Sequence, residues 1–230
     1  LPISEMWRIV LASLVVGFST LTADAAELRG TVSNEQGAVE NAVIYAIPLG
    51  SPPAASAAEA IIDQVDKLYT PFVSALRAGT TVKFPNKDNI KHHLYSVSKA
   101  KSFERPLYTG QKAAPVVFDK QGEVTLGCNI HDWMIAHILV LDTPYTKVTD
   151  KTGQAVISDM PAGTYAVRVW HPGMKGKKKA AKNPRTVTLA AAAVEIDFKI
   201  RLRPKSRWWR EKPADADKNY ADDERNSTGN

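Results

Sequence analysis

The sequence predicts an all-β protein. Short runs rich in Val, Ile, Thr, Tyr and Phe recur along most of the chain, and turn residues such as Gly, Asn, Asp and Pro separate them. The runs follow one another at roughly the 8 to 12 residue spacing that is typical of a β-sandwich. The alanine run at 190–193 is too short for a helix, and its flanks are β-branched. We therefore expect β-sandwich architecture outside the two ends of the chain.

Residues 1–26 have the features of an export signal. A positive start at Arg8 precedes the apolar run IVLASLVVGF, and the tripeptide ADA matches the small-residue pattern of a cleavage site. We expect cleavage near Ala25 or Ala26 and a periplasmic or secreted product. The alternative is a membrane anchor, but the apolar run is shorter than the roughly 20 residues that a spanning helix needs. We therefore expect no stable membrane insertion after signal removal.

The net charge of +6 comes from 30 Lys and Arg residues and 24 Asp and Glu residues. Much of the excess lies in two local runs, 175–182 and 201–210, and not on one face of the fold. An exported protein does not normally meet nucleic acid, so we expect no nucleic-acid partner. Solvated loops are our first interpretation of these runs, and contact with an acidic protein or a membrane surface is the second.

The first half of the chain predicts strands interrupted by one linker. Residues 28–48 form two β-branched runs around a Gln-Gly turn, which predicts a hairpin. Residues 49–60 are rich in Pro, Ser and Ala and predict a linker or a long loop. Residues 61–98 again carry apolar residues at short intervals between turn signals, as expected for further strands of a sandwich.

The second half continues the same pattern. Residues 114–128 predict a strand pair in which Val124, Leu126 and Cys128 alternate and therefore share one face, which we expect to be the interior. The run MIAHILVLD supplies the returning strand. Residues 145–200 again predict strand, turn and strand. Residues 202–230 are polar and highly charged and predict a disordered tail.

The segment GCNIHDWMIAH holds Cys128, the single cysteine of the chain. Exported proteins often pair their cysteines in disulfides, so a lone thiol indicates a catalytic nucleophile, an inert core residue or a metal ligand. His131 and Met134 follow in the spacing Cys-x2-His-x2-Met, and His92 and His93 stand at the start of an upstream strand. Two imidazoles, a thiolate and a thioether form the ligand set of a mononuclear electron-transfer copper site, which is a trigonal His2Cys centre with a weak axial Met.

These motifs resemble those of the cupredoxins, the blue-copper family of plastocyanin and amicyanin. Gly122, Glu123 and Val124 match the family pattern before the cysteine, and the short ligand loop is similar to that of amicyanin. The segment TVKFPNKDNIKHH resembles the family's V-x-F-x-N strand and the loop that ends in the first histidine ligand. The resemblance covers about residues 60–142 and implies a Greek-key β-sandwich.

The same resemblance implies the ligands of one type 1 copper ion. Spacing from the V-x-F-x-N motif assigns the first ligand to His92, and Cys128, His131 and Met134 complete the set. His93 is held in reserve, because it stands where the family usually has an Asn that braces the cysteine loop.

Two further resemblances concern the surroundings of this region. The segments IDQVDKLYTPFV and GCNIHDWM are similar to exported proteins of the methylamine utilisation type. Residues 27–50 and 143–201 resemble a carboxypeptidase regulatory-like β-sandwich, which implies that the cupredoxin domain is inserted into, or packed beside, a second and discontinuous sandwich.

Together these observations predict a periplasmic blue copper protein that is not an enzyme and carries single electrons between redox proteins. A dehydrogenase donor and a c-type cytochrome acceptor are the implied partners. We expect Trp133 to form part of an apolar rim around an exposed edge of His131, and His137 to lie at the surface or the rim.

Three other functions remain open at this stage. The chain could carry or sense copper, or it could be a structural or carbohydrate-interacting β-sandwich protein with a vestigial or zinc-occupied site. A Cys-His nucleophile, oriented by Asn129 or Asp132, is the enzymatic alternative. Zinc would accept Cys and His but would gain nothing from Met134.

Overall fold

The computed structural model describes residues 26–216 except 52, 55–57, 111–112, 176–183 and 191. The predicted export signal lies outside the described residues, except for Ala26. Apart from the 3-10 turn η1 (Lys205–Arg207), every regular element in the described part of the chain is a β-strand. The prediction of an all-β protein is therefore confirmed. Among the described residues, no helix has the length and apolarity needed to cross a membrane.

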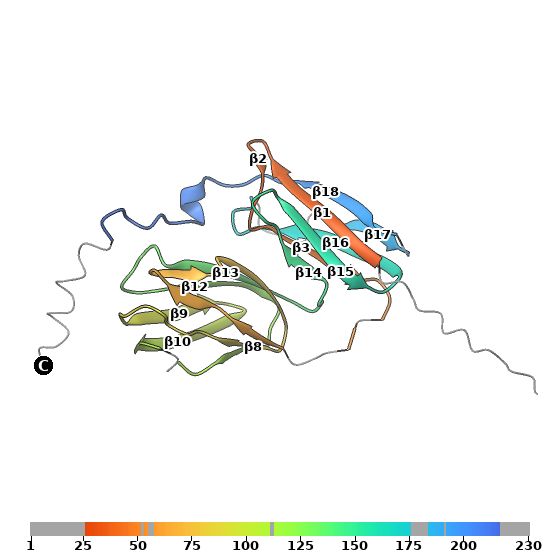
Figure 1. Ribbon diagram of the computed structural model, residues 1–230. Coiled ribbons are helices and arrows are strands. Elements are labelled where there is room, and N and C mark those ends of the chain that lie inside the picture. The colour runs from red at the N-terminus through yellow and green to blue at the C-terminus, as the bar shows by residue number, and fades with distance from the viewer. Residues whose placement is uncertain are drawn as a thin grey trace, which may run out of the picture.

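The strands form two halves that lie side by side (Figure 1). We call them the flanking half and the inserted half, because the chain leaves the first after β3 and returns to it at β14. The flanking half contains β1 (Ala26–Asn34), β2 (Gly37–Ala38), β3 (Val43–Pro48), β14 (Thr146–Val148), β15 (Gln154–Met160), β16 (Gly163–Trp170), β17 (Arg185–Leu189) and β18 (Val194–Lys199). The inserted half contains β4 (Glu59–Ile61), β5 (Asp63–Val65), β6 (Leu68–Thr70), β7 (Val73–Arg77), β8 (Thr80–Lys83), β9 (His92–Ser98), β10 (Lys101–Tyr108), β11 (Val116–Phe118), β12 (Gly122–Gly127) and β13 (Ile135–Leu141).

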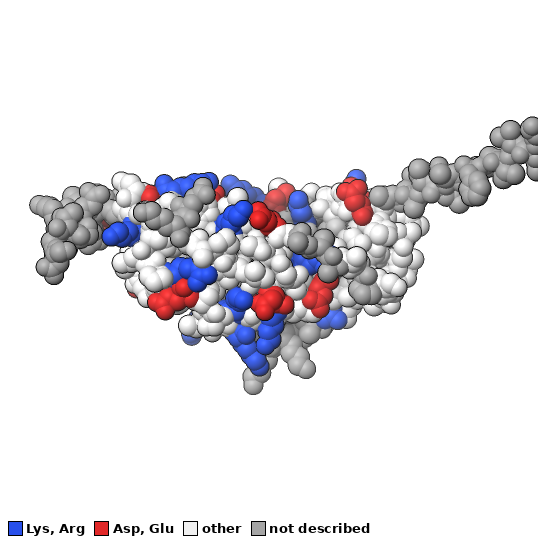
Figure 2. All heavy atoms as spheres, turned by 90° about the horizontal axis from the view of Figure 1, so that it is seen from below, with Lys and Arg blue, Asp and Glu red and all other residues white. Residues whose placement is uncertain are grey.

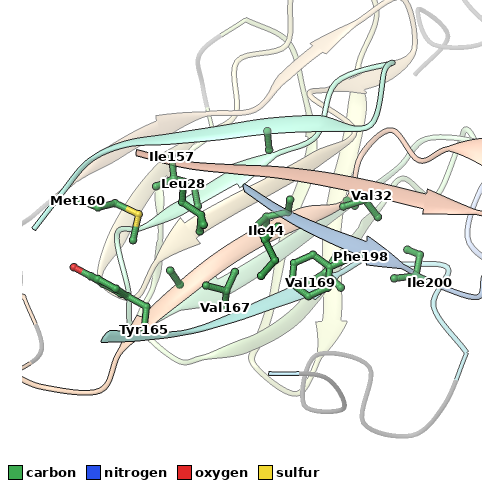
Figure 3. Close-up of a cluster of buried hydrophobic side chains, with 14 of the residues drawn as sticks. Leu28, Val32, Ile44, Ile157, Met160, Tyr165, Val167, Val169, Phe198 and Ile200 are labelled. Atoms are coloured by element: carbon green, nitrogen blue, oxygen red, sulfur yellow. The ribbon is translucent and has the colours of Figure 1, made fainter. Parts of the chain in front are cut away.

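In the flanking half, one sheet has the order β15-β1-β18 with β2 on β1, and the other has the order β14-β3-β16-β17. Inward and outward positions alternate along β1, so that Leu28, Gly30 and Val32 are buried while Arg29 and Thr31 face outward. The buried side chains point toward those of the other sheet, such as Ile44 and Val167, and form one core (Figure 3). Gly30 is needed for this packing, because a Cβ there would lie 2.2 Å from Ile44 Cδ1.

In the inserted half, a five-stranded sheet has the order β10-β9-β12-β13-β7, and a three-stranded sheet has the order β11-β8-β4. The core of this half includes Phe84, Leu94, Phe118 and Leu126. Strand β13 is buried from Ala136 to Leu141, because it lies between β12 and β7 and also contacts the flanking half. Burial on both faces explains why its sequence, apart from His137, is apolar instead of alternating.

A small apolar cluster joins the two halves. It contains Val43, Tyr45 and Trp170 from the flanking half and Val73, Leu139 and Leu141 from the inserted half. Burial of these side chains favours one fixed arrangement of the halves. The C-terminal segment contacts both halves as well, through Trp208 against His171 and Trp209 against Phe72.

The C-terminal segment differs from its prediction. The sequence predicts a disordered tail from 202 to 230, but the structure places residues 202–216 along the molecule after β18 (Figure 1, blue). Trp208 packs against His171 with ring centroids 4.6 Å apart, and Trp209 packs against Phe72 at 4.7 Å. Aromatic burial therefore holds a sequence whose composition is that of a disordered segment. Residues 217–230 lie outside the described residues.

Charged side chains of both signs are interspersed over the face seen in Figure 2. Several of them form exposed ion pairs, such as Lys101 with Asp119 at 2.9 Å. This distribution gives no single-sign surface on that face. Residues 176–182 of the first predicted basic run lie outside the described residues.

Candidate metal centre

Strand pairing brings together two parts of the chain that lie far apart in sequence. Strands β9 and β12 are antiparallel neighbours, and Tyr95 pairs with Gly127. Because β12 ends at Gly127, the start of β9 lies opposite the loop that follows, and this loop continues from Cys128 to Met134. His92 is the first residue of β9 and therefore faces the cysteine loop.

Three of the predicted ligands form one cluster. The ligand atoms of His92, Cys128 and His131 all lie within 4.8 Å of one another. The two imidazole Nδ1 atoms are 3.2 Å apart, and Cys128 Sγ is 3.9 Å from His131 Nδ1. The three residues are between 0% and 5% exposed. Three converging donors in a dry pocket are the arrangement that a small metal ion requires.

Met134 lies in the same buried cluster as Cys128 and is 1% exposed. Its N–H donates to the carbonyl of His131 at 2.9 Å, which closes the ligand loop into a tight turn. This turn brings the backbone of Met134 next to that of His131. Met134 also lines, together with Cys128, a surface groove that includes Tyr95 and Arg210.

His93 lies on the opposite face of β9, because neighbouring residues of a strand point to opposite sides. Its Nε2 is 2.7 Å from Glu104 Oε1, and its ring stacks on Tyr95 with centroids 5.7 Å apart. The structure therefore brings His92, and not His93, to Cys128. The sequence spacing favours His92 but leaves its neighbour His93 as the alternative ligand.

Asp88 fixes the orientation of His92. The Asp88 carboxylate lies 2.7 Å from His92 Nε2 and also accepts the N–H groups of Asp66 and Lys67, at 2.6 and 2.9 Å. A proton on Nε2 that is donated to Asp88 leaves the Nδ1 lone pair free to face Cys128 and His131.

Burial lowers the pKa of His92, and the hydrogen bond and charge of Asp88 only partly oppose this effect. Burial alone would raise the pKa of Asp88, but its hydrogen bonds from His92, Lys67 and Asp66 lower it overall. The imidazole is thus neutral and the carboxylate ionised at neutral pH, which suits a metal ligand and the residue that orients it.

Aromatic residues surround the donors. The ring of Trp133 lies 5.1 Å from that of His131, and its Nε1 donates to the Lys67 carbonyl at 3.1 Å. The Tyr69 hydroxyl donates to the Gly127 carbonyl, directly before the cysteine, at 3.0 Å. Burial raises the pKa of Tyr69 well above its usual value, and the neighbouring Cys128 adds to this shift.

Two expectations about this region are wrong. His131 is only 5% exposed, so its ring is largely buried instead of presenting an open edge. His137 is also buried, at 8% exposed, where its Nε2 donates to the Trp208 carbonyl at 2.9 Å. The C-terminal segment covers His137, and sequence reasoning that treats this segment as disordered cannot anticipate the contact.

Sequence reasoning also missed Asp88 and Lys67. One weak signal for Asp88 exists, since a carboxylate four residues before a metal-binding histidine can reach the second ring nitrogen. Lys67 carries no signal, because its contacts to the site depend on a hairpin turn that only the folded chain brings close.

No family model and no curated protein sequence matches the chain. Among solved structures, the chain is similar to a copper-containing nitrite reductase from Thermus scotoductus, with 24% identity and a TM-score of 0.35, over 41% of this chain and 25% of the reductase. It therefore spans only about a quarter of that enzyme.

The chain is also similar to a mutant of amicyanin in the Cu(I) state, with 17% identity and a TM-score of 0.34, over 36% of this chain and 82% of the amicyanin. A purple cupredoxin from Nitrosopumilus maritimus gives 24% identity and a TM-score of 0.31, over 36% of this chain and 99% of the cupredoxin. At such low TM-scores and identities, these similarities alone establish no function, and the function has to follow from the site itself.

Proposed function

We propose that the protein is a periplasmic type 1 copper protein that carries single electrons between redox partners. The observation that supports this proposal is the convergence of His92 Nδ1, Cys128 Sγ and His131 Nδ1 within 4.8 Å in a buried pocket. The two imidazoles, the thiol and the thioether of Met134 match the trigonal His2Cys set with an axial Met.

The donor set fits copper better than zinc. Structural zinc sites use four strong donors, whereas this pocket offers three and a thioether, which is a weak ligand for zinc. A bound copper ion would supply a one-electron couple. The protein's own residues would keep the structural rearrangement between the two oxidation states small. Cys128 and Met134 favour Cu(I), and the imidazoles suit both oxidation states, so that little has to move on electron transfer.

Four features of the protein would support the carrier role. Asp88 and Trp133 contact the two histidines and hold their rings in place. Cys128, Met134 and Leu126 belong to a buried apolar core, which limits the access of water to the donors. A rigid and dry pocket lowers the rearrangement that each electron transfer requires. The groove beside Cys128 and Met134 gives redox partners a close approach.

The site offers poor support for the enzymatic alternative. Cys128 is 4% exposed, so a substrate has little access to its sulfur. Asn129 and Asp132, which could orient a Cys-His nucleophile, are both exposed. A nucleophile needs a base that a third group orients and a sulfur that a substrate can reach. His131 Nδ1 lies 3.9 Å from Cys128 Sγ and a groove runs beside the cysteine, but the sulfur residue is itself buried. We therefore propose a carrier and not an enzyme.

The wider assignments belong to the same proposal. We take residues 60–142 as a cupredoxin domain, and residues 27–50 and 143–201 as the carboxypeptidase regulatory-like sandwich that holds it. Residues 1–26 would be the signal that directs export. The partners would be a dehydrogenase donor and a c-type cytochrome acceptor, as the resemblance to methylamine utilisation proteins implies.

The test is the visible absorption spectrum of the purified protein after loading with Cu(II). An intense blue thiolate-to-copper band that disappears on reduction supports the proposal, and the Cys128→Ser variant should lack the band. A protein that stays colourless while it binds zinc tightly would contradict it. Copper carriage, the second candidate, predicts rapid loss of Cu(I) to a chelator, whereas an electron carrier retains its metal.

A further inference from the structure

The turn between β5 and β6 contacts the first candidate ligand through one intermediate residue. The Lys67 N–H donates to Asp88 Oδ2 at 2.9 Å, and the same oxygen lies 2.7 Å from His92 Nε2. His92 is fully buried, so a shift of this turn cannot be compensated by water around the ring. The position of Lys67 therefore sets the position of the carboxylate that orients His92.

The same turn contacts the second candidate ligand from the other side. The Lys67 carbonyl accepts the indole N–H of Trp133 at 3.1 Å, and the Trp133 ring lies 5.1 Å from the ring of His131. The backbone N–H of Lys67 thus contacts His92 through Asp88, and its carbonyl contacts His131 through Trp133. Lys67 is therefore common to the contacts that support the two histidines.

The backbone of this turn needs support from outside. Asp66 and Lys67 both have a φ of 55°, in the left-handed region that non-glycine residues adopt only at a cost. Two-residue hairpin loops of this kind usually contain Asn-Gly or Asp-Gly for that reason. The Asp88 carboxylate accepts both backbone N–H groups and supports the turn from the inside.

The C-terminal segment supports the turn from the outside. Lys67 Nζ donates to the Ala216 carbonyl at 2.9 Å, and both residues are buried, at 8% and 7% exposed. Lys212 Nζ lies 2.6 Å from Asp66 Oδ1, although this carboxylate is exposed and the pair is correspondingly weak. The shielded bond of Lys67 is therefore the stronger link between the turn and the segment.

The segment itself is fixed to both halves. Arg203 N donates to the Gly173 carbonyl in the flanking half at 2.7 Å. In the inserted half, the Trp208 carbonyl accepts His137 Nε2 at 2.9 Å, and Trp209 packs against Phe72. The segment can therefore transmit support to Lys67 instead of following its movements.

We infer that Lys67 is a positioning residue through which the C-terminal segment, residues 203–216, holds both candidate histidine ligands in place. The proposal that these histidines bind copper is a premise of the metal-binding part of this inference only. The positioning itself is a property of the metal-free protein. The positioning role of Lys67 and the proposed copper function can therefore be refuted independently of each other.

The test replaces Lys67 by Met in the full chain, which keeps most of the apolar stem and removes the donor to Ala216. In the metal-free protein, hydrogen exchange of the Trp133 indole N–H should become about five-fold faster, the ratio expected for the loss of one buried hydrogen bond. In the Cu(I)-loaded protein, release of copper to a chelator should accelerate by about the same factor. The conservative variant Lys67→Arg, which retains a donor, should restore most of both rates.

Two further variants make the result specific. Lys120→Met makes the same chemical change at an exposed position before β12 and should leave both rates unchanged. Trp209→Ala removes an anchor of the segment without touching Lys67 or a ligand, and it should accelerate both rates in the same direction. It also replaces Lys67→Met as the test if that variant does not fold.

The outcomes separate the two proposals. Faster indole exchange in a protein that takes up no copper supports the positioning role while the proposed function fails. A blue copper protein in which Lys67→Met and Trp209→Ala match the Lys120→Met control in both rates overturns the inference while the proposed function stands.

Discussion

The contacts of Asp88 give a prediction with a magnitude that can be worked out from the structure. Its Oδ2 serves the N–H of Lys67 and His92 Nε2, and its Oδ1 serves the N–H of Asp66. An Asn at this position has only one oxygen, and its NH2 group would face at least one of these donors. Hydrogen bonds to a charged group contribute roughly 1.5–3 kcal/mol each.

The size of the effect depends on where the remaining oxygen lies. If it takes the place of Oδ2, only the exposed Asp66 N–H loses its acceptor, and water can replace part of the bond. We therefore expect Asp88→Asn to lower the free energy of unfolding of the metal-free protein by about 2 kcal/mol. Copper affinity should fall by about 10- to 100-fold, because a neutral amide oxygen orients the ring of His92 and supports its basicity less strongly than the carboxylate does.

Urea unfolding of the metal-free protein and competition of the copper-loaded protein with a chelator would measure the two effects. Asp119→Asn is the matched control, because this carboxylate is exposed and its ion-pair partner, Lys101, is not a candidate ligand. Exposed pairs contribute about 0–1 kcal/mol, so the control should change little. If Asp88→Asn equals the control in both measurements, Asp88 does not orient His92, and the reasoning about the site is refuted.

Three other changes test the site and its surroundings. His92→Ala should abolish the blue band, whereas His93→Ala should retain it, and absorption spectra of the two copper-loaded variants would show whether the assignment is correct. Gly127→Ala should destabilise the metal-free protein by about 1 kcal/mol in urea unfolding, because the new Cβ would lie 2.9 Å from Tyr95 Cζ and Oη and the partly buried Tyr95 ring would have to move away. Adding Tyr95→Ala should relieve the clash, and a double variant that shows no relief would argue against this packing. Met134→Leu should cost less than about 1.5 kcal/mol of stability while it shifts the reduction potential, as voltammetry would detect, since the volume is kept and the thioether is lost.

Local patterns in the sequence were sufficient for the class of fold. Alternation along β1 and β12 places Leu28, Val32 and Leu126 inside, as the period of a strand requires. The spacing from Cys128 to His131 also places two donors on one short loop without further information. These features are local, because they depend on residues that are close in sequence.

The tertiary structure alone decided which histidine joins the loop, since His92 and His93 differ only in the face of β9 on which they lie. It also decided the role of the C-terminal segment, whose charged composition predicts disorder. Composition describes the average solvation of a segment, but Trp208, Trp209 and the partner surfaces they meet depend on the arrangement of the two halves.

The sequence by itself therefore determined the all-β class and the identity of the candidate donors, because strand periodicity and ligand chemistry are properties of residues and their spacing. Only the tertiary structure decided that Asp88 and Lys67 lie beside these donors and that the indole of Trp133 donates to the Lys67 carbonyl. Such contacts join segments from different strands and loops. Their distances depend on how strands pair and pack, and the local sequence does not specify which distant strands pair.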